Sequence, residues 1–338
     1  MNKTERPTLE DVAQAAQVST ATISRSINEP DKVAESTRDR IQSVIRELGY
    51  TPNVGGRILA SNRSNTVGAI IPTMANAMFA NALQAFQEEL AKAGVTMLIA
   101  SSGYNSDEEL LQIKSLMAHG ADGLLLIGDQ RPQESIDFLA MRNIPYVISW
   151  CHKTDPDRVF AGFDNAGAAC AMTRHVLDLG HRRIAMIAGT AKDNDRAKNR
   201  IQGVRRAVKS YGKDAQLVKI IEADYSMENG GDAFEQLMAL SDSPTAIVCG
   251  NDVLAAGAVV RAQQRGVKVP DDVSVTGFDD INLATAVYPA LTTVRVPHIE
   301  MGRSAATLLL ELLSGNEKPA SVKFETEIIS RESLAAAR

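Results

Sequence analysis

From residue 65 onward the chain alternates short apolar runs with longer stretches of helical periodicity. TVGAII, VTMLIAS, GLLLIG and YVIS form a first series of apolar runs, and RIAMIAG, LVKIIEA, TAIVCG and VSVTGF form a second. Continuous apolar runs separated by helices are typical of parallel strands that are covered by helices on both faces. Two such series predict two doubly wound subdomains. Ligands in such sheets bind outside the carboxyl ends of the strands, here in the cleft between the two halves.

A helix-turn-helix pattern precedes this region, in the sequence LEDVAQAAQVSTATISRSIN of residues 9–28. We expect helices over residues 9–16 and 19–28, with apolar positions at helical spacing on Val12, Ala13, Ala16, Val18, Ile23 and Ile27. These side chains would pack the two helices steeply against each other, and Ser19 would cap the second helix. A small helical hairpin buried inside a larger domain is the alternative interpretation.

The outward face of the second helix carries Thr20, Ala21, Ser24 and Arg25 near its N-terminal end. This end of a recognition helix reaches base edges in the major groove, where Arg can bond guanine bidentately. A third helix is predicted over residues 34–48, and Gly49 would stop it.

Several separate segments resemble the lactose-repressor/galactose-repressor (LacI/GalR) family of bacterial transcription regulators. They are LEDVAQAAQVSTATISRSIN, YTPN, VPDDVSVTGFDD and PALTTVRVP, and the resemblance extends from Pro7 to about Arg331. It implies an α/β protein with an all-α helix-turn-helix head. The body would be two-lobed and like a periplasmic binding protein, with two Rossmann-like parallel-sheet subdomains.

The resemblance also implies the domain boundaries. The head would occupy residues 1–52, a hinge helix or linker residues 53–64, and an effector-binding and dimerisation domain residues 65–338. Within that domain, the N-lobe would comprise about 65–162 and 292–324, and the C-lobe about 163–291 and 325–338.

The overall charge argues mildly against a nucleic-acid-binding function, because the sequence pI is about 5.7. The average hides a difference, since residues 1–64 carry a net charge of +1 and the remainder −6. A few placed residues would therefore contact phosphates: Arg6, Arg38, Arg57 and Arg63.

We expect DNA contacts from the head and the hinge, with Leu59 wedged into the minor groove. The expected set is Thr8, Ser19, Thr20, Ala21, Thr22, Ser24, Arg25, Asn28, Tyr50, Asn53, Arg57 and Leu59. Gly55 and Gly56 stand where the family commonly has a helix-forming pair, and Gly disfavours a helix interior. Residues 53–62 are therefore expected to fold only on DNA.

The effector-binding candidates follow the ends of the apolar runs. They are Met78, Phe79, Trp150, His152, Arg196, Arg200, Tyr225, Asn251 and Asp279. The resemblance implies that Arg200 and Asp279 contact the effector and that Tyr225 stacks on it. Core packing is the alternative for Met78, Phe79 and Tyr225.

Two further expectations concern single positions near these candidates. Asp252 is expected to cap the helix that follows it. Trp150, the only Trp of the chain, stands where family members often carry Asp.

Enzyme functions are disfavoured by the sequence, which lacks G-x-G-x-x-G after a strand, a Walker loop, G-x-S-x-G and H-E-x-x-H. We expect no cofactor and no metal site, because Cys151, Cys170 and Cys249 lack zinc-ligand spacing and are expected to be buried thiols. His181 is expected to be structural.

The expected partners are a pseudo-palindromic DNA operator, a small-molecule effector and a second copy of the chain. A dimer is favoured over a tetramer because RESLAAAR is no heptad tail. Without an apolar leader or a membrane-length apolar run, a cytoplasmic location is expected. A periplasmic-type sugar-binding protein without a regulatory role is the alternative.

A sugar acid such as gluconate is our hypothesis for the effector. ILASN, GFDNAGAA and the pair Asp195-Arg196 resemble the gluconate-utilisation repressors. Basic side chains are also common among the residues expected in the cleft, namely Arg196, Lys198, Arg200 and His152. A neutral hexose or pentose is the alternative.

Overall fold

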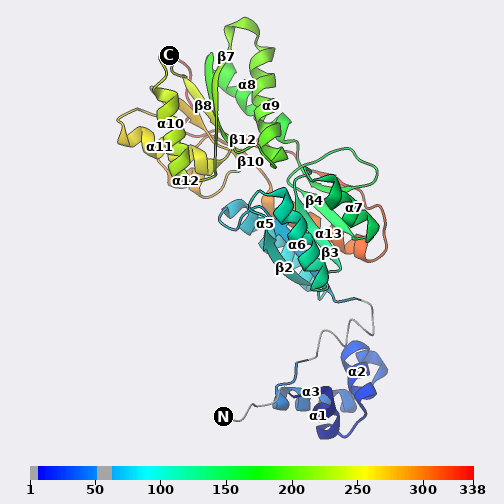
Figure 1. Ribbon diagram of the computed structural model, residues 1–338. Helices are drawn as coiled ribbons and strands as arrows, with labels where there is room; N and C mark the ends of the chain where they lie inside the picture. The colour runs from blue at the N-terminus through cyan, green and yellow to red at the C-terminus, as the bar shows by residue number, and fades with distance from the viewer. Residues whose placement is uncertain (1–6, 52–62) are drawn as a thin grey trace. The chain divides into compact units, whose positions relative to one another are not determined.

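The computed structural model in Figure 1 describes residues 7–51 and 63–338. The chain divides into two compact units between Ser64 and Asn65. The hinge predictions for Asn53, Arg57 and Leu59, and for the Gly55-Gly56 pair, lie outside the described residues.

The first unit consists of short helices around one small core. Its elements are α1 (Leu9–Ala15), α2 (Thr20–Asn28), the 3₁₀ helix η1 (Pro30–Lys32) and α3 (Glu35–Leu48). The predicted apolar positions form this core: Val12, Ala13, Ala16, Ile23 and Ile41 are buried, and Val18 and Ile27 pack against them. The helix-turn-helix prediction is therefore confirmed.

Side chains at the helix starts explain where α1 and α2 begin. The Thr8 hydroxyl accepts a hydrogen bond from the Asp11 backbone N–H, while the Asp11 carboxylate accepts from the Thr8 backbone N–H, which is a capping box. At α2, Ser19 Oγ accepts from the Thr22 backbone N–H at 3.2 Å, as predicted. Gly49 adopts the left-handed conformation that ends α3.

The N-lobe contains a six-stranded, wholly parallel sheet. Its order is β11-β5-β4-β3-β1-β2. The strands are β1 (Thr66–Ile71), β2 (Thr96–Ser101), β3 (Gly123–Ile127), β4 (Tyr146–Ser149), β5 (Val159–Gly162) and β11 (Val322–Lys323).

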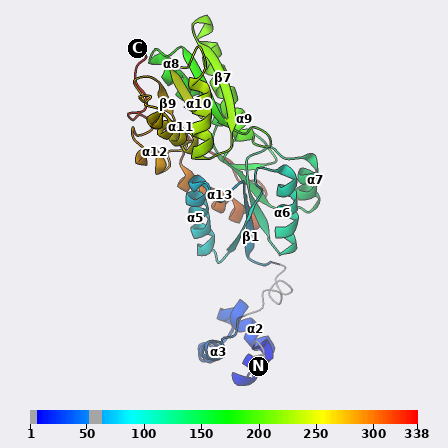
Figure 2. The same ribbon diagram turned by 60° about the vertical axis from the view of Figure 1, so that its left-hand side comes forward.

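Helices cover both faces of this sheet, because successive strand residues point to opposite sides. On β1, Val67 and Ala69 face α5 (Ala77–Lys92) and α13 (His298–Leu313), whereas Ile70 faces α6 (Ser106–Ala118) and α7 (Gln133–Met141). Figure 2 shows β1 between α5 and α6.

The C-lobe repeats this architecture with a four-stranded parallel sheet of order β7-β6-β8-β9. The strands are β6 (Arg183–Gly189), β7 (Gln216–Ala223), β8 (Ala246–Cys249) and β9 (Ser274–Thr276). The core pairs β6 with α8 (Asn165–Asp178) and α9 (Asp195–Ser210) on one face, and with α10 (Met227–Met238) and α11 (Asp252–Gln264) on the other. Short helices η2 (Gly212–Asp214) and α12 (Leu283–Ala286) complete the lobe.

Three chain segments join the lobes. The chain leaves the N-lobe after β5, returns through β10 (Thr293–Arg295) and leaves again through β12 (Glu327–Ile329), which pairs antiparallel with β10. The two Rossmann-like sheets agree with the fold that the resemblance implied. In the described part of the chain, no helix has the length and apolar character needed to cross a membrane.

Two sequence predictions about individual residues are also confirmed. His181 is structural, since its ring nitrogens contact Thr245 Oγ1 at 3.1 Å and the Ala335 carbonyl at 2.9 Å. All three cysteines are free and buried.

We predict that Ser19→Ala destabilises the helix-turn-helix unit by about 1 kcal/mol, because the Thr22 N–H loses its partner. Faster amide hydrogen exchange across residues 9–48 of the full chain would report the change. Ser19→Asn, which keeps a capping oxygen, should exchange as the wild-type protein does. Equal exchange in Ser19→Ala and wild type would contradict the assigned cap.

Candidate functional site

The exposed face of α2 is the candidate DNA-binding surface of the first unit. Thr20, Ala21 and Arg25 are exposed, while Thr22 and Ser24 are partly buried and Ile23 lies in the core. Thr20 and Ser24 lie one turn apart, as do Ala21 and Arg25. These four residues form a short face without large apolar side chains, which begins at the capped end of the helix. Free backbone N–H groups at a helix start, with a positive local dipole, suit contact with phosphate.

Three other predicted DNA contacts of the head, Thr8, Ser19 and Tyr50, have structural partners. Thr8 Oγ1 donates to Asp11 Oδ2 at 2.8 Å, and Ser19 Oγ lies 2.9 Å from Thr22 Oγ1. Tyr50 packs against the head core. Thr8, Ser19 and Tyr50 thus fix the helices that present the exposed face, and Asn28 is the last residue of α2.

A cavity of about 460 Å³ lies between the two lobes of the second unit. Every segment that lines it directly follows the carboxyl end of a parallel strand: β1, β2, β6, β7 or β8. Its lining residues are Thr73, Ala75, Asn76, Gly103, Tyr104, Asn105, Thr190, Lys192, Asp193, Asn194, Asp224, Tyr225 and Val253. This position agrees with the rule for ligand sites in parallel sheets.

Two tyrosines from opposite lobes meet at this cavity. The rings of Tyr104 and Tyr225 lie 5.6 Å apart at 41°. Burial, and then the neighbouring Tyr225, raise the pKa of Tyr104, so its hydroxyl remains protonated. The Asn194 amide donates to the Tyr225 hydroxyl at 3.3 Å. Gly189 is required beneath this ring, because any Cβ there would overlap with Tyr225.

Polar and charged side chains from both lobes line the cavity. Asn76 caps α5, since its side-chain oxygen accepts a hydrogen bond from the Met78 backbone N–H. The buried side-chain amide nitrogen of Asn76 has no partner within the described chain. The charged lining residues are Lys192, Asp193 and Asp224, and Asp224 accepts a hydrogen bond from Thr190 Oγ1 at 2.9 Å. The charged side chains of the lining therefore sum to a formal charge of −1.

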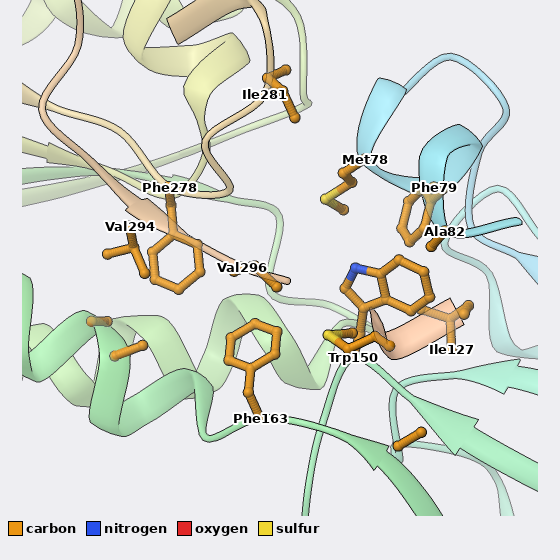
Figure 3. Close-up of a cluster of buried hydrophobic side chains, with 14 of the residues drawn as sticks. Met78, Phe79, Ala82, Ile127, Trp150, Phe163, Phe278, Ile281, Val294 and Val296 are labelled. Atoms are coloured by element: carbon orange, nitrogen blue, oxygen red, sulfur yellow. The ribbon is translucent and has the colours of Figure 1, made fainter. Parts of the chain in front are cut away.

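Of the nine predicted effector residues, Tyr225 lines this cavity. Met78, Phe79 and Trp150 are buried in a hydrophobic cluster beside it (Figure 3). The rings of Phe79 and Trp150 lie 5.1 Å apart.

The Arg200 guanidinium is fully engaged inside the C-lobe. It donates to Asn165 Oδ1 at 2.9 Å and to the Gly250 carbonyl at 2.6 Å, and its third contact, to Asp279 Oδ1, is 3.4 Å. It also lies over the Phe278 ring, 3.7 Å from the centroid. Burial raises the pKa of Asp279 to about 6, against the lowering effect of Arg200.

The expected cap of α11 needs correction. Asp252 is not the helix cap: Asn251 caps α11 by accepting from the Leu254 N–H at 2.9 Å. Asp252 instead accepts from the Ile281 N–H and from Thr293 Oγ1, and burial followed by the nearby Asp279 raises its pKa to about 8. The helix thus begins one residue earlier than the sequence pattern suggested.

His152 lies away from the inter-lobe cavity. It lines a different cavity, formed by the loop before β5 and the loop before β11, and its ring lies 6.3 Å from Phe160. Although it stands two positions after Trp150, the chain has by then turned away from the inter-lobe cavity.

The sequence interpretation missed Tyr104, which lines the inter-lobe cavity. Asn76 and Asn194 also line it, and both lie in segments that the sequence placed in the cleft because they follow apolar runs. The same positional signal was available for Tyr104, since it closely follows the predicted strand VTMLIAS.

A polar clasp joins the lobes beside the cavity. Asp195 Oδ2, at the start of α9, accepts from the Asp129 backbone N–H at 2.9 Å. The neighbouring Arg196 donates to the Ile127 carbonyl at 3.2 Å and to Asp195 Oδ1 at 3.0 Å. Both backbone groups of the N-lobe lie at the end of β3, and Gly128 between them has φ +76°.

We predict that Gly128→Ala opens this clasp, because a Cβ at Gly128 would overlap with the Arg196 guanidinium and the Asp195 carboxylate. Small-angle X-ray scattering should give a larger radius of gyration. Gly94→Ala is the matched control, since Gly94 has a similar φ of +69° but open space where its Cβ would lie. If both variants scatter as the wild-type protein does, the clasp does not hold the lobes together.

Comparison with known proteins places this architecture in a family. Residues 8–53 match the bacterial regulatory proteins of the lacI family, and residues 173–334 match the periplasmic binding protein-like domain. The chain is 33% identical over 332 residues to the HTH-type transcriptional repressor CytR of Escherichia coli (strain K12), a match that covers 97% of this chain and 96% of CytR.

Solved structures agree with this assignment. The transcriptional regulator CelR in complex with cellobiose has a TM-score of 0.72 and 29% identity, covering 97% of this chain and 100% of CelR. The lac repressor dimer bound to operator and the anti-inducer ONPF has a TM-score of 0.84 and 25% identity, covering 98% of this chain and 100% of the repressor. The chain belongs to the lacI family of DNA-binding bacterial transcription regulators.

Proposed function

We propose that this protein is a repressor of carbohydrate-utilisation genes whose affinity for operator DNA is set by a small neutral sugar bound between its lobes. The cavity carries this proposal, because its lining comes from both lobes. A molecule held there contacts both lobes at once, so it can favour one relative arrangement over another. Binding of the sugar and binding of DNA are then reciprocally coupled.

A neutral sugar is favoured over the sugar acid hypothesised from the sequence. Arg196 is paired with Asp195, and Arg200 with Asp279. Lys198 donates to Gln130 Oε1 at 3.0 Å, and His152 faces another cavity. Three of the basic side chains that suggested gluconate thus have partners within the chain, and the fourth lies at another cavity. Aromatic rings such as Tyr104 and Tyr225 suit the apolar face of a sugar, and CelR, a relative of similar fold, is described in complex with cellobiose.

The proposed assembly is a homodimer with one recognition helix on each half of a pseudo-palindromic operator in the cytoplasm. The lac repressor relative is a dimer on its operator. In this chain the edge strand β2 and the start of α5 present an apolar groove lined by Met74, Met97 and Ile99, of which Met74 is 62% exposed. An exposed sheet edge with apolar side chains suits a second copy of the chain.

An enzymatic role is not part of the proposal, since the relatives are transcription regulators. A sugar-binding protein without a regulatory role is the alternative function. The capped and exposed face of α2 argues against it, because such a protein has no use for a helix-turn-helix unit.

We predict that Arg25→Ala weakens binding to the preferred operator by about 1–3 kcal/mol and relaxes preference at one base pair. The operator would first be selected from a random duplex library, and affinities measured at one fixed salt concentration. Arg46→Ala, exposed on the last turn of α3, is the control and should keep the base preference. A uniform loss on all sequences would make Arg25 a phosphate contact, and no selected sequence at all would favour the alternative function.

We predict that a neutral sugar raises the melting temperature of the protein and changes its operator affinity, whereas gluconate does neither. A ligand at one hundred times its dissociation constant stabilises the folded state by about 2.7 kcal/mol. The panel would contain D-glucose, D-ribose, cellobiose and D-gluconate. Stabilisation by gluconate alone would restore the sugar-acid hypothesis.

A further inference from the structure

A buried carboxylate joins two of the three crossovers, the chain segments that connect the lobes. Asp280 follows β9 in the C-lobe, and only 8% of its side chain is exposed. Its Oδ2 accepts from Arg295 Nε at 2.7 Å, and its Oδ1 accepts from Arg331 Nη2 at 2.7 Å. Arg295 ends β10 in the second crossover, and Arg331 lies two residues beyond β12 in the third. One side chain of the C-lobe therefore holds both crossovers.

The second and third crossovers are also bonded to each other. β10 and β12 pair antiparallel (Figure 1), with Arg295 opposite Glu327, and the charged atoms of these two side chains lie 3.4 Å apart. Just before β10, Thr292 Oγ1 accepts from the Arg331 backbone N–H at 2.9 Å and donates to the Arg331 carbonyl at 3.0 Å. We therefore expect the two crossovers to move as one body, which Asp280 connects to the C-lobe.

The backbone at Asp280 is strained. The φ angle is +107° at Asp279 and +54° at Asp280, in the left-handed region that residues with side chains rarely adopt. Hydrogen bonds on either side maintain this turn. The Asp279 N–H donates to the Val294 carbonyl of β10 at 2.8 Å, and the Ile281 N–H donates to Asp252 Oδ2 at 2.9 Å. Because a strained turn persists only where its surroundings determine it, this turn and β10 depend on each other.

The ionic contacts of Asp280 resist one particular movement of the lobes. Hydrogen bonds between an arginine and a carboxylate are stronger than those between neutral groups. Water can take the place of Arg295, whose side chain is 51% exposed, more easily than that of Arg331, which is 16% exposed. A shift of the crossovers away from the C-lobe breaks both contacts and leaves a buried carboxylate without its partners, which is costly. A movement in which the crossovers follow the C-lobe breaks neither contact.

We propose that Asp280 is a positioning residue of the inter-lobe hinge: it fixes the second and third crossovers to the C-lobe and thereby sets how the lobes move when a ligand binds. The ligand-dependent part of this inference rests on the proposed function. Asp280, Arg295 and Arg331 do not belong to the lining of the inter-lobe cavity. Their effect is therefore on the movement of the lobes and not on contact with the ligand.

The test variant is Asp280→Asn, examined as the full chain without ligand. Asn has nearly the size of Asp and also tolerates the left-handed backbone, but it is neutral and has one acceptor oxygen. Because the crossovers lose their attachment to the C-lobe, we expect amide hydrogen exchange at residues 293–295 and 327–331 to become about tenfold faster. Exchange on β1 and β6, inside the two lobes, should remain as in the wild-type protein.

The matched control is Glu235→Gln. Glu235 lies on α10 in the C-lobe and also contacts two arginines, Arg261 at 3.0 Å and Arg265 at 2.5 Å, but these lie on α11 and just after it and not on a crossover. This variant should leave exchange in the crossovers unchanged. If Asp280→Asn does not fold, Arg295→Gln replaces it, because it removes one of the two contacts from a half-exposed position. A smaller acceleration at the same amides is then expected.

A second arm measures operator affinity with and without a neutral sugar that stabilises the wild-type protein. In Asp280→Asn, this sugar should still bind but change operator affinity by a factor about threefold smaller than in the wild-type protein, because less of the lobe movement is transmitted. Unchanged exchange in the crossovers, exchange that rises evenly over both lobes as for a merely structural ion pair, or an unchanged operator response would each overturn the inference. If no sugar binds the wild-type protein, the proposed effector class is wrong, and the exchange measurements alone decide the role of Asp280.

Discussion

Parallel strand pairing is the constraint on which the rest of this structure depends. Parallel neighbours must be joined by crossovers, and those crossovers run as helices over both faces of each sheet. All strands of a sheet therefore end at the same edge. In both lobes this edge faces the other lobe, so that loops after five strands line one cavity. The site is a consequence of strand direction before any single side chain is considered.

Most of the fold was predictable because it depends on local sequence patterns. Apolar runs and helical periodicity indicated the strands and helices, and Ser19 and Gly49 marked helix ends through their own backbone and side-chain chemistry. The crossovers between the lobes were predicted from the family resemblance and not from local patterns, because no local pattern indicates which sheet a strand joins.

The candidate site was less predictable, since it depends on which partners compete for each polar group. The resemblance implied ligand contacts for Arg200 and Asp279, and that stays a prediction; the sequence did not show that Arg200 also contacts Asn165, Gly250 and Asp279 in the folded chain. Asp252 looked like a cap, but the adjacent Asn251 takes that role. Tyr104 was not predicted as a site residue, although the fold brings its ring against that of Tyr225 from the other lobe. Such outcomes depend on contacts between segments far apart in sequence.

The two lobes meet through contacts of different physical character, and this difference bears on regulation. The clasp of Asp195 and Arg196 on the end of β3 is directional, because each hydrogen bond requires a particular distance and angle. The cluster around Trp150 is apolar and tolerates sliding, since its attraction depends on buried area and not on direction. A ligand in the inter-lobe cavity contacts both lobes. Its hydrogen bonds would add to the directional contacts, whereas its apolar surface would add to the buried area, so the two kinds of ligand contact constrain the lobes differently.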